Sequence, residues 1–131
     1  MGVRLNERVR QLLDGRNHAT LATINPDGSP QTSVIWVGRD GDEVVFSTTA
    51  ERYKTRNMCR DPRVSITIFD HGDPNTYAEI RGTVTFTQEG SREPVEQLAQ
   101  KYIGREFYPE PPDVVRVTAR LTPTKVTGYA A

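Results

Sequence analysis

The sequence predicts a mainly β protein with short helices, in which six antiparallel strands form a small β-barrel. Three observations lead to this prediction. Six runs of β-branched and aromatic residues follow one another along the chain, and turn residues separate several of them. The helical patterns between these runs are short. The expected hairpins favour a barrel with helices packed at its openings over a doubly wound parallel sheet, and closure would remove exposed strand edges.

Length and composition narrow the class of protein. A chain of 131 residues is typical of one domain, so we expect a single cofactor-binding domain over residues 1–131. The 17 basic and 17 acidic residues cancel, which argues against a general electrostatic attraction to nucleic acid or membrane. No apolar run approaches the roughly 18 residues of a membrane span, and residues 1–6 lack the apolar stretch of an export signal, so neither feature is expected.

The single cysteine, Cys59, excludes an intramolecular disulfide and a zinc site built from paired cysteines. A reducing compartment fits this composition, so we expect a cytoplasmic protein. Because Cys59 lies in a predicted helix beside Met58, we expect a buried, inert thiol. Two isolated histidines do not predict a metal site.

The first half of the chain predicts a helix and three strands. Apolar residues recur at helical spacing before a possible stop at Gly15: Leu5, Val9, Leu12 and Leu13. A strand over 18–25 then leads through the turn Pro26–Ser29 into a second strand over 31–37. A polar tip at Gly38–Gly41 precedes a third strand over 43–49. We expect these three strands to form a meander.

The second half predicts further short elements. The basic segment after residue 50 is expected to be helical up to Asp61, because Pro62 disfavours helical dihedrals before it, and a strand follows over 63–69. After a loop over 70–75, residues 77–86 alternate between apolar and polar, typical of a half-buried strand. Ser91 is expected to cap a helix that ends at Gly104. A proline-rich linker over 107–113 precedes a final strand over 114–121.

A cationic helix start beside a hydroxyl-rich strand end indicates a phosphate site. The segment Glu51–Arg63 carries five of the 17 basic residues and follows the strand that ends at Thr49. Unpaired N–H groups at a helix start favour an anion, and Arg52, Lys54 and Arg56 add full charges. The alternative is an ordinary solvated helix face, in which these side chains only flank the core.

The order and spacing of several short motifs resemble a known family over nearly the whole chain. These motifs are Leu21–Pro30, Thr32–Val37, Phe46–Ala50, Lys54–Asn57, Asp61–Val64 and Tyr77–Gly82. The chain resembles the flavin and deazaflavin oxidoreductases that share the split β-barrel fold of pyridoxamine 5'-phosphate oxidase. This resemblance implies a six-stranded split β-barrel and a homodimer whose cofactor lies in a groove between the subunits.

The resemblance also implies the site residues. Arg52 and Lys54 are expected to bind the cofactor phosphate, with hydroxyl groups nearby from Ser47, Thr48 and Thr55. The ring is expected to lie along the second strand, which would place four of its residues against the ring: Gln31, Thr32, Ser33 and Val34. Trp36 is expected at the edge of the ring or in the core, and Tyr77 is expected to come from the neighbouring subunit.

The resemblance favours coenzyme F420, a deazaflavin, with FMN as the alternative. The chain ends in Thr122–Ala131 and not in the segment rich in Arg, Trp and His that shapes the substrate pocket of true pyridoxamine phosphate oxidases. The F420-dependent branch ends in this way, and Arg56 and Arg60 would suit the more anionic tail of F420. FMN shares the ring system, the ribityl chain and the first phosphate.

Three functional classes follow. The favoured one is an F420-dependent reductase that passes a hydride to a conjugated small molecule such as a quinone, an enone, a lactone or a tetrapyrrole. No catalytic residue is assigned, because the cofactor supplies the chemistry. The second is a noncatalytic carrier of flavin, deazaflavin or haem. The third, a nucleic-acid-binding barrel, is disfavoured by the short basic cluster and the zero net charge.

Overall fold

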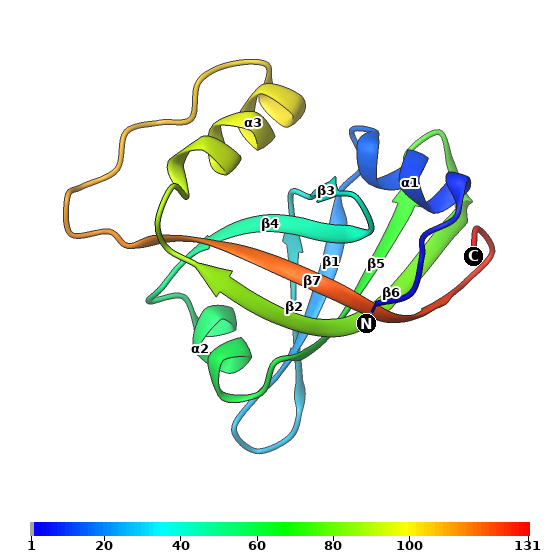
Figure 1. The fold of residues 1–131 in the computed structure, drawn as a ribbon, viewed down its shortest axis with the longest axis horizontal. Helices are drawn as coiled ribbons and strands as arrows, with labels where there is room; N and C mark the ends of the chain where they lie inside the picture. The colour runs from blue at the N-terminus through cyan, green and yellow to red at the C-terminus, as the bar shows by residue number, and fades with distance from the viewer. Residues whose placement is uncertain (1) are drawn as a thin grey trace.

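One antiparallel sheet of seven strands makes up most of the molecule, and the computed structural model describes residues 2–131 (Figure 1). The strands are β1 (Ala19–Ile24), β2 (Pro30–Ile35), β3 (Gly38–Asp40), β4 (Glu43–Thr49), β5 (Arg63–Asp70), β6 (Asp73–Thr87) and β7 (Arg116–Thr127). Their order across the sheet is β2-β1-β5-β6-β7-β4-β3. The mainly β architecture is therefore as the sequence predicts.

The two edges of this sheet are consecutive in the chain. β2 forms one edge and β3 the other, and only Trp36 and Val37 separate them. The sheet must therefore curl until its edges approach each other at this point, which gives a barrel-like form. β2 pairs with β1 alone among the described strands, so the other edge of β2 stays free.

The prediction of six strands and of an N-terminal meander is wrong. Residues 38–40, expected as a polar tip, form β3 and pair with β4, whereas β4 pairs with β7 and not with β2. The cause lies at Val37, whose N–H donates to the Tyr102 hydroxyl at 3.1 Å. The Val37 carbonyl accepts from Lys101 Nζ at 2.6 Å. Side chains of a distant helix thus take the place of ladder partners, and the strand breaks there.

Three helices accompany the sheet: α1 (Glu7–Asp14), α2 (Tyr53–Arg60) and α3 (Arg92–Ile103). All three were predicted. The Asn6 side chain accepts from the Val9 N–H at 2.8 Å and begins α1, and Gly104, with φ of 68°, ends α3. Ser91 is the N-cap residue of α3 as predicted, but its side chain makes no capping hydrogen bond, because its hydroxyl donates instead to the Thr87 carbonyl at 2.7 Å.

Several boundaries and one burial assignment differ from the predictions. The loop expected over 70–75 shrinks to a tight turn, because β5 and β6 pair as far as Asp70 and Asp73. β7 begins at Arg116 and continues to Thr127, so pairing with the long β6 extends it beyond the predicted end. Cys59 is exposed and not buried, since α2 turns that position toward solvent.

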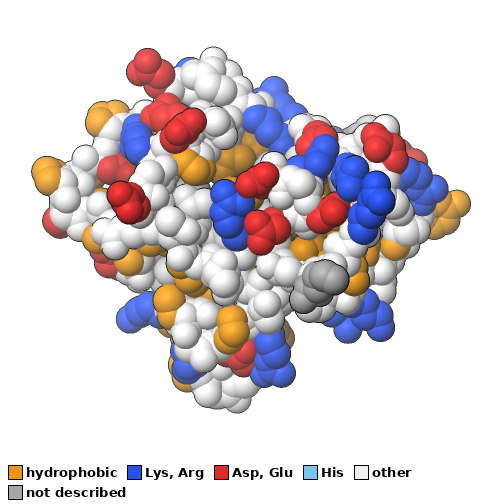
Figure 2. Space-filling model, viewed as in Figure 1, with side chains coloured by type: hydrophobic (Ala, Val, Ile, Leu, Met, Phe, Trp, Pro, Cys, Tyr) orange, Lys and Arg blue, Asp and Glu red, His pale blue; other side chains and the backbone are white. Residues whose placement is uncertain are grey.

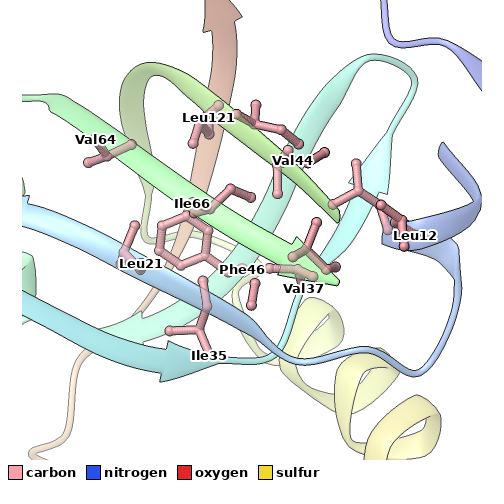
Figure 3. Close-up of a cluster of buried hydrophobic side chains, with 14 of the residues drawn as sticks. Leu12, Leu21, Ile35, Val37, Val44, Phe46, Val64, Ile66 and Leu121 are labelled. Carbon is pink, nitrogen blue, oxygen red and sulfur yellow. The ribbon is translucent and has the colours of Figure 1, made fainter. Parts of the chain in front are cut away.

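The core fills the inside of the curled sheet (Figure 3). The Phe46 ring lies among Leu21, Ile66 and Leu121, and all four side chains are fully buried. Leu12 joins this core from α1. Among residues 2–131, no helix has the length and apolar character needed to cross a bilayer.

Candidate functional site

Hydroxyl groups hold the junction between β4 and α2 in place. The hydroxyls of Thr48 and Thr55 are 3.0 Å apart, and the Thr55 hydroxyl also lies 2.7 Å from the Thr49 carbonyl oxygen. Both threonines are buried. These two predicted phosphate partners therefore face each other and the backbone, and they position the first turn of α2.

The far end of α2 is fixed to the end of β1. The Asn57 side-chain amide donates to the Thr23 hydroxyl at 3.1 Å and to Asn25 Oδ1 at 2.9 Å. Arg60 donates to the Ile24 carbonyl and to Asn57 Oδ1. Because both ends of α2 are anchored, the direction of its first-turn side chains is set by the sheet.

Lys54 is the most unusual charged residue in this region. Its side chain is buried, with the residue only 8% exposed, and its ammonium donates to the Ser33 hydroxyl on β2 at 3.3 Å. Burial, together with repulsion from Arg52, lowers the pKa of Lys54 below its usual value. Among the described residues no carboxylate pairs with Lys54 or Arg52. A buried ammonium without a counter-ion is costly, and a bound anion would compensate it.

Lys54 faces a cavity of about 180 Å³. One wall is polar and cationic and is built by Ser47, Arg52, Lys54 and Arg116. The rest is mainly apolar, with one tyrosine, and consists of Val34, Ile35, Trp36, Val95, Leu98, Phe107 and Tyr108. A cavity with this division suits a ligand that has an anionic group at one end and an aromatic or apolar body at the other.

The structure brings together five of the predicted site residues around this cavity: Val34, Trp36, Ser47, Arg52 and Lys54. Ser33 joins them through its hydrogen bond to Lys54. Gln31 and Thr32 precede them on β2 but do not line the cavity, and the Gln31 side chain accepts from the Thr23 hydroxyl at 2.6 Å. Val34 is 66% exposed although it is apolar, and it lies on the free-edged strand.

Trp36, which directly follows β2, belongs to an aromatic stack with Tyr102 of α3. Its ring lies parallel to that of Tyr102, with centroids 5.5 Å apart, and meets Phe107 edge to face at 6.4 Å. One side of Trp36 therefore packs in the protein while the residue still contributes to the cavity wall. The contact of Trp36 with the edge of a cofactor ring, one of the two alternatives that the sequence left open, stays a prediction.

Tyr77 lies apart from the cavity within this chain. It is 40% exposed on β6, and its carbonyl accepts from the Ala130 N–H at 2.8 Å near the C-terminus. The expectation that it serves the neighbouring subunit stays a prediction.

Arg56 is exposed, and its guanidinium carbon lies 5.7 Å from the centroid of the Tyr53 ring. Neither Arg56 nor Arg60 is among the residues that line the cavity.

The sequence did not reveal the part of the cavity lining that follows α3 in the chain. Phe107 and Tyr108 come from the proline-rich segment that was expected to be only a linker, and Arg116 begins β7. The Arg116 guanidinium donates to the Ser47 hydroxyl at 3.3 Å. Two aromatic residues within a proline-rich segment were an available signal, but Arg116 reaches Ser47 only through the pairing of β4 with β7.

The described residues contain no group of three or more metal-binding side chains. The two histidines, His18 and His71, stack with ring centroids 5.2 Å apart. Burial, and then the nearby His71 and Arg16, lower the pKa of His18. This pair is not among the residues that line the cavity.

Comparison with known proteins adds the family and the fold. A family model described as pyridoxamine 5'-phosphate oxidase matches residues 5–129. A solved structure named as an F420 reductase is 30% identical, with a TM-score of 0.84 over 94% of this chain and 98% of that chain.

Two further solved structures share the fold. A conserved hypothetical protein from Mycobacterium tuberculosis is 23% identical, with a TM-score of 0.76 over 95% of this chain and 84% of that chain. General stress protein 26 from Bacillus anthracis is 18% identical, with a TM-score of 0.67 over 92% and 89% of the two chains.

Proposed function

The chain belongs to the pyridoxamine 5'-phosphate oxidase family, whose fold is that of flavin-binding oxidoreductases, and we propose that it is a reductase dependent on coenzyme F420. The proposed reaction transfers a hydride from the reduced deazaflavin to a conjugated small-molecule acceptor. FMN is the alternative cofactor, because it carries its phosphate at the corresponding position of a ribityl chain attached to a similar ring.

Lys54 is the observation that carries the proposal. Its ammonium is buried and has no carboxylate partner among the described residues, and it lines a cavity that also contains Arg52 and Ser47. A phosphate would supply the missing negative charge through charge-assisted hydrogen bonds. The cavity therefore fits a phosphorylated cofactor better than a neutral ligand.

The neighbouring β2 strand suits the flat ring of such a cofactor. Its outer edge has no strand partner, so backbone N–H and C=O groups there are available to the polar edge of a ring. Trp36, Phe107 and Tyr108 provide an aromatic part of the cavity wall. When bound, the deazaflavin would supply the hydride, and these residues would bind and orient it.

A homodimer is part of this proposal. The exposed Val34 and the free edge of β2 would both be covered if a second copy of the chain closed the groove. The acceptor would then enter from the dimer interface. A cytoplasmic location agrees with the single, unpaired cysteine.

The choice of F420 over FMN rests on likeness to the F420 reductase, which extends over nearly the full length of both chains. A nucleic-acid-binding role has less support. On the face shown in Figure 2, basic and acidic side chains are interspersed and form no continuous positive band. Binding along a nucleic-acid backbone normally requires such a band.

The test is a titration of the protein with F420 and with FMN, followed by fluorescence of Trp36, the only tryptophan of the chain. We expect saturable binding of F420 that is tighter than that of FMN. Reduced F420 with a panel of quinones, enones and tetrapyrroles should then show turnover. Binding without turnover would favour a carrier, tighter binding of FMN would favour the alternative cofactor, and no binding of either would refute the proposal.

A further inference from the structure

Arg116 is a third cation in the wall of the cavity. It lines the cavity beside Lys54 and Arg52, and its side chain is only 12% exposed. Its guanidinium donates to the Ser47 hydroxyl at 3.3 Å and lies over the Phe107 ring at 5.1 Å. An arginine held in this way is rigid and could contribute directly to binding an anion.

The charge of Arg116 is nevertheless already matched by Glu110. Both carboxylate oxygens of Glu110 accept from this guanidinium, and the Glu110 side chain is only 13% exposed. Glu110 also lies 3.6 Å from Arg92, which in turn pairs with Glu96 at 2.6 Å. Two arginines and two glutamates thus form a network with no net charge.

Lys54 and Arg52 differ from this network, because neither has a carboxylate partner among residues 2–131. The cavity wall therefore carries three cations, and a carboxylate lies behind one of them, Arg116. An entering anion is attracted by all three cations but is repelled by Glu110, which offsets the charge of Arg116. The repulsion grows with each negative charge that the anion carries.

From this arrangement we propose that Glu110 influences specificity by weakening the attraction of a doubly charged phosphomonoester more than that of a singly charged phosphodiester. This inference rests on the proposed function and deepens it. F420 carries its ribityl phosphate as a diester, with one charge, whereas the monoester of FMN carries close to two at neutral pH. Glu110 would thus help to separate two cofactors whose rings are similar.

The size of the effect follows from Coulomb's law. For one additional charge roughly 6 to 10 Å from a carboxylate in a partly solvated site, the expected discrimination is about three- to tenfold. Glu110→Gln removes the negative charge and keeps the shape of the side chain. The variant should therefore bind both kinds of ligand more tightly, and the monoester should gain more.

The test uses two ligands that share one ring: the 5'-phosphate of the F420 deazaflavin and the methyl ester of that phosphate. Their dissociation constants are measured on the full chain, directly or by displacement of F420. We expect the ratio of the monoester constant to the diester constant to fall about three- to tenfold in Glu110→Gln. If the wild-type protein binds only the diester detectably, Glu110→Gln should bind the monoester tightly enough for its dissociation constant to be measured.

Two variants serve as controls. Glu106→Gln makes the same change of charge at an exposed position of the same segment, and Glu110→Asp keeps the charge at the original position. Both should retain the wild-type ratio, and thermal unfolding checks that all three variants are folded. An unchanged ratio in Glu110→Gln would overturn the role of Glu110 and leave the proposed function intact. No binding of either ligand or of F420 would refute the proposed function itself.

Discussion

The ammonium nitrogen of Lys54 on α2 lies 3.3 Å from the hydroxyl oxygen of Ser33 on β2. This hydrogen bond connects the two elements that the proposed function assigns to the two parts of the cofactor, α2 to the phosphate and β2 to the ring. Since Lys54 has no carboxylate partner among the described residues, its remaining donors are available to a ligand.

Lys54→Ala should weaken cofactor binding by about 1.5–3 kcal/mol, the usual range for a hydrogen bond to a charged group. This corresponds to a roughly 10- to 150-fold higher dissociation constant, which isothermal titration calorimetry can measure. Lys125→Ala is the matched control, because Lys125 is exposed on β7 and does not line the cavity. Unchanged affinity in a folded Lys54→Ala protein would remove Lys54 from the site.

Thr55→Val should reduce the free energy of unfolding by about 1–3 kcal/mol, because it removes a buried hydroxyl and leaves its partners at Thr48 and Thr49 unsatisfied. Urea unfolding measures this loss. The control is Thr85→Val on the exposed face of β6, where we expect a change within about 0.5 kcal/mol. Wild-type stability combined with weaker cofactor binding would instead assign the Thr55 hydroxyl to the ligand.

Gly82→Ala should be severely destabilising, by about 3 kcal/mol or more. A Cβ at this position would lie 2.0 Å from the Thr122 carbonyl oxygen, at the register shift between β6 and β7. Because both groups belong to the backbone, no side-chain rotation relieves the overlap. Gly38→Ala is the control, since its Cβ would meet Leu98 at an ordinary 3.6 Å. Thermal unfolding compares the two, and equal melting temperatures would contradict the prediction.

The free energy of unfolding should rise with pH between about 8 and 10.5, because Lys101 titrates in this interval. Burial lowers the pKa of Lys101 from its usual 10.5 to about 8, although Asp14 acts in the opposite direction. In this interval the unfolded chain binds more protons than the native protein, so unfolding takes up a proton and the free energy of unfolding increases with pH.

Lys101→Arg provides the comparison, because arginine keeps its charge throughout this interval and retains donors for the Leu13 and Val37 carbonyls. Urea unfolding across the interval should give a smaller pH slope for the variant than for wild type. Identical slopes would exclude Lys101 as the titrating group.

Local patterns account for the features that the sequence predicted. The helical spacing of Val9, Leu12 and Leu13, the positive φ of Gly28 in the first hairpin and the alternation along 77–86 all depend on residues close together in the chain. The cluster of cations after β4 is local in the same way. Hence the mainly β class, the three helices and the position of Lys54 at a helix start could be inferred without coordinates.

Contacts between distant segments decided the rest. The strand predicted over 31–37 ends early because Tyr102, far along the chain, takes the Val37 N–H, and the seventh strand follows from that break. Arg116 faces Ser47 only because β7 pairs with β4, and Glu110 then cancels its charge. The sequence by itself determined the three helices, six of the seven strands and the cationic end of the site, since these depend on neighbouring residues. The tertiary structure decided which strands pair, which residues complete the cavity wall and how much charge the cavity holds, because those depend on non-local packing.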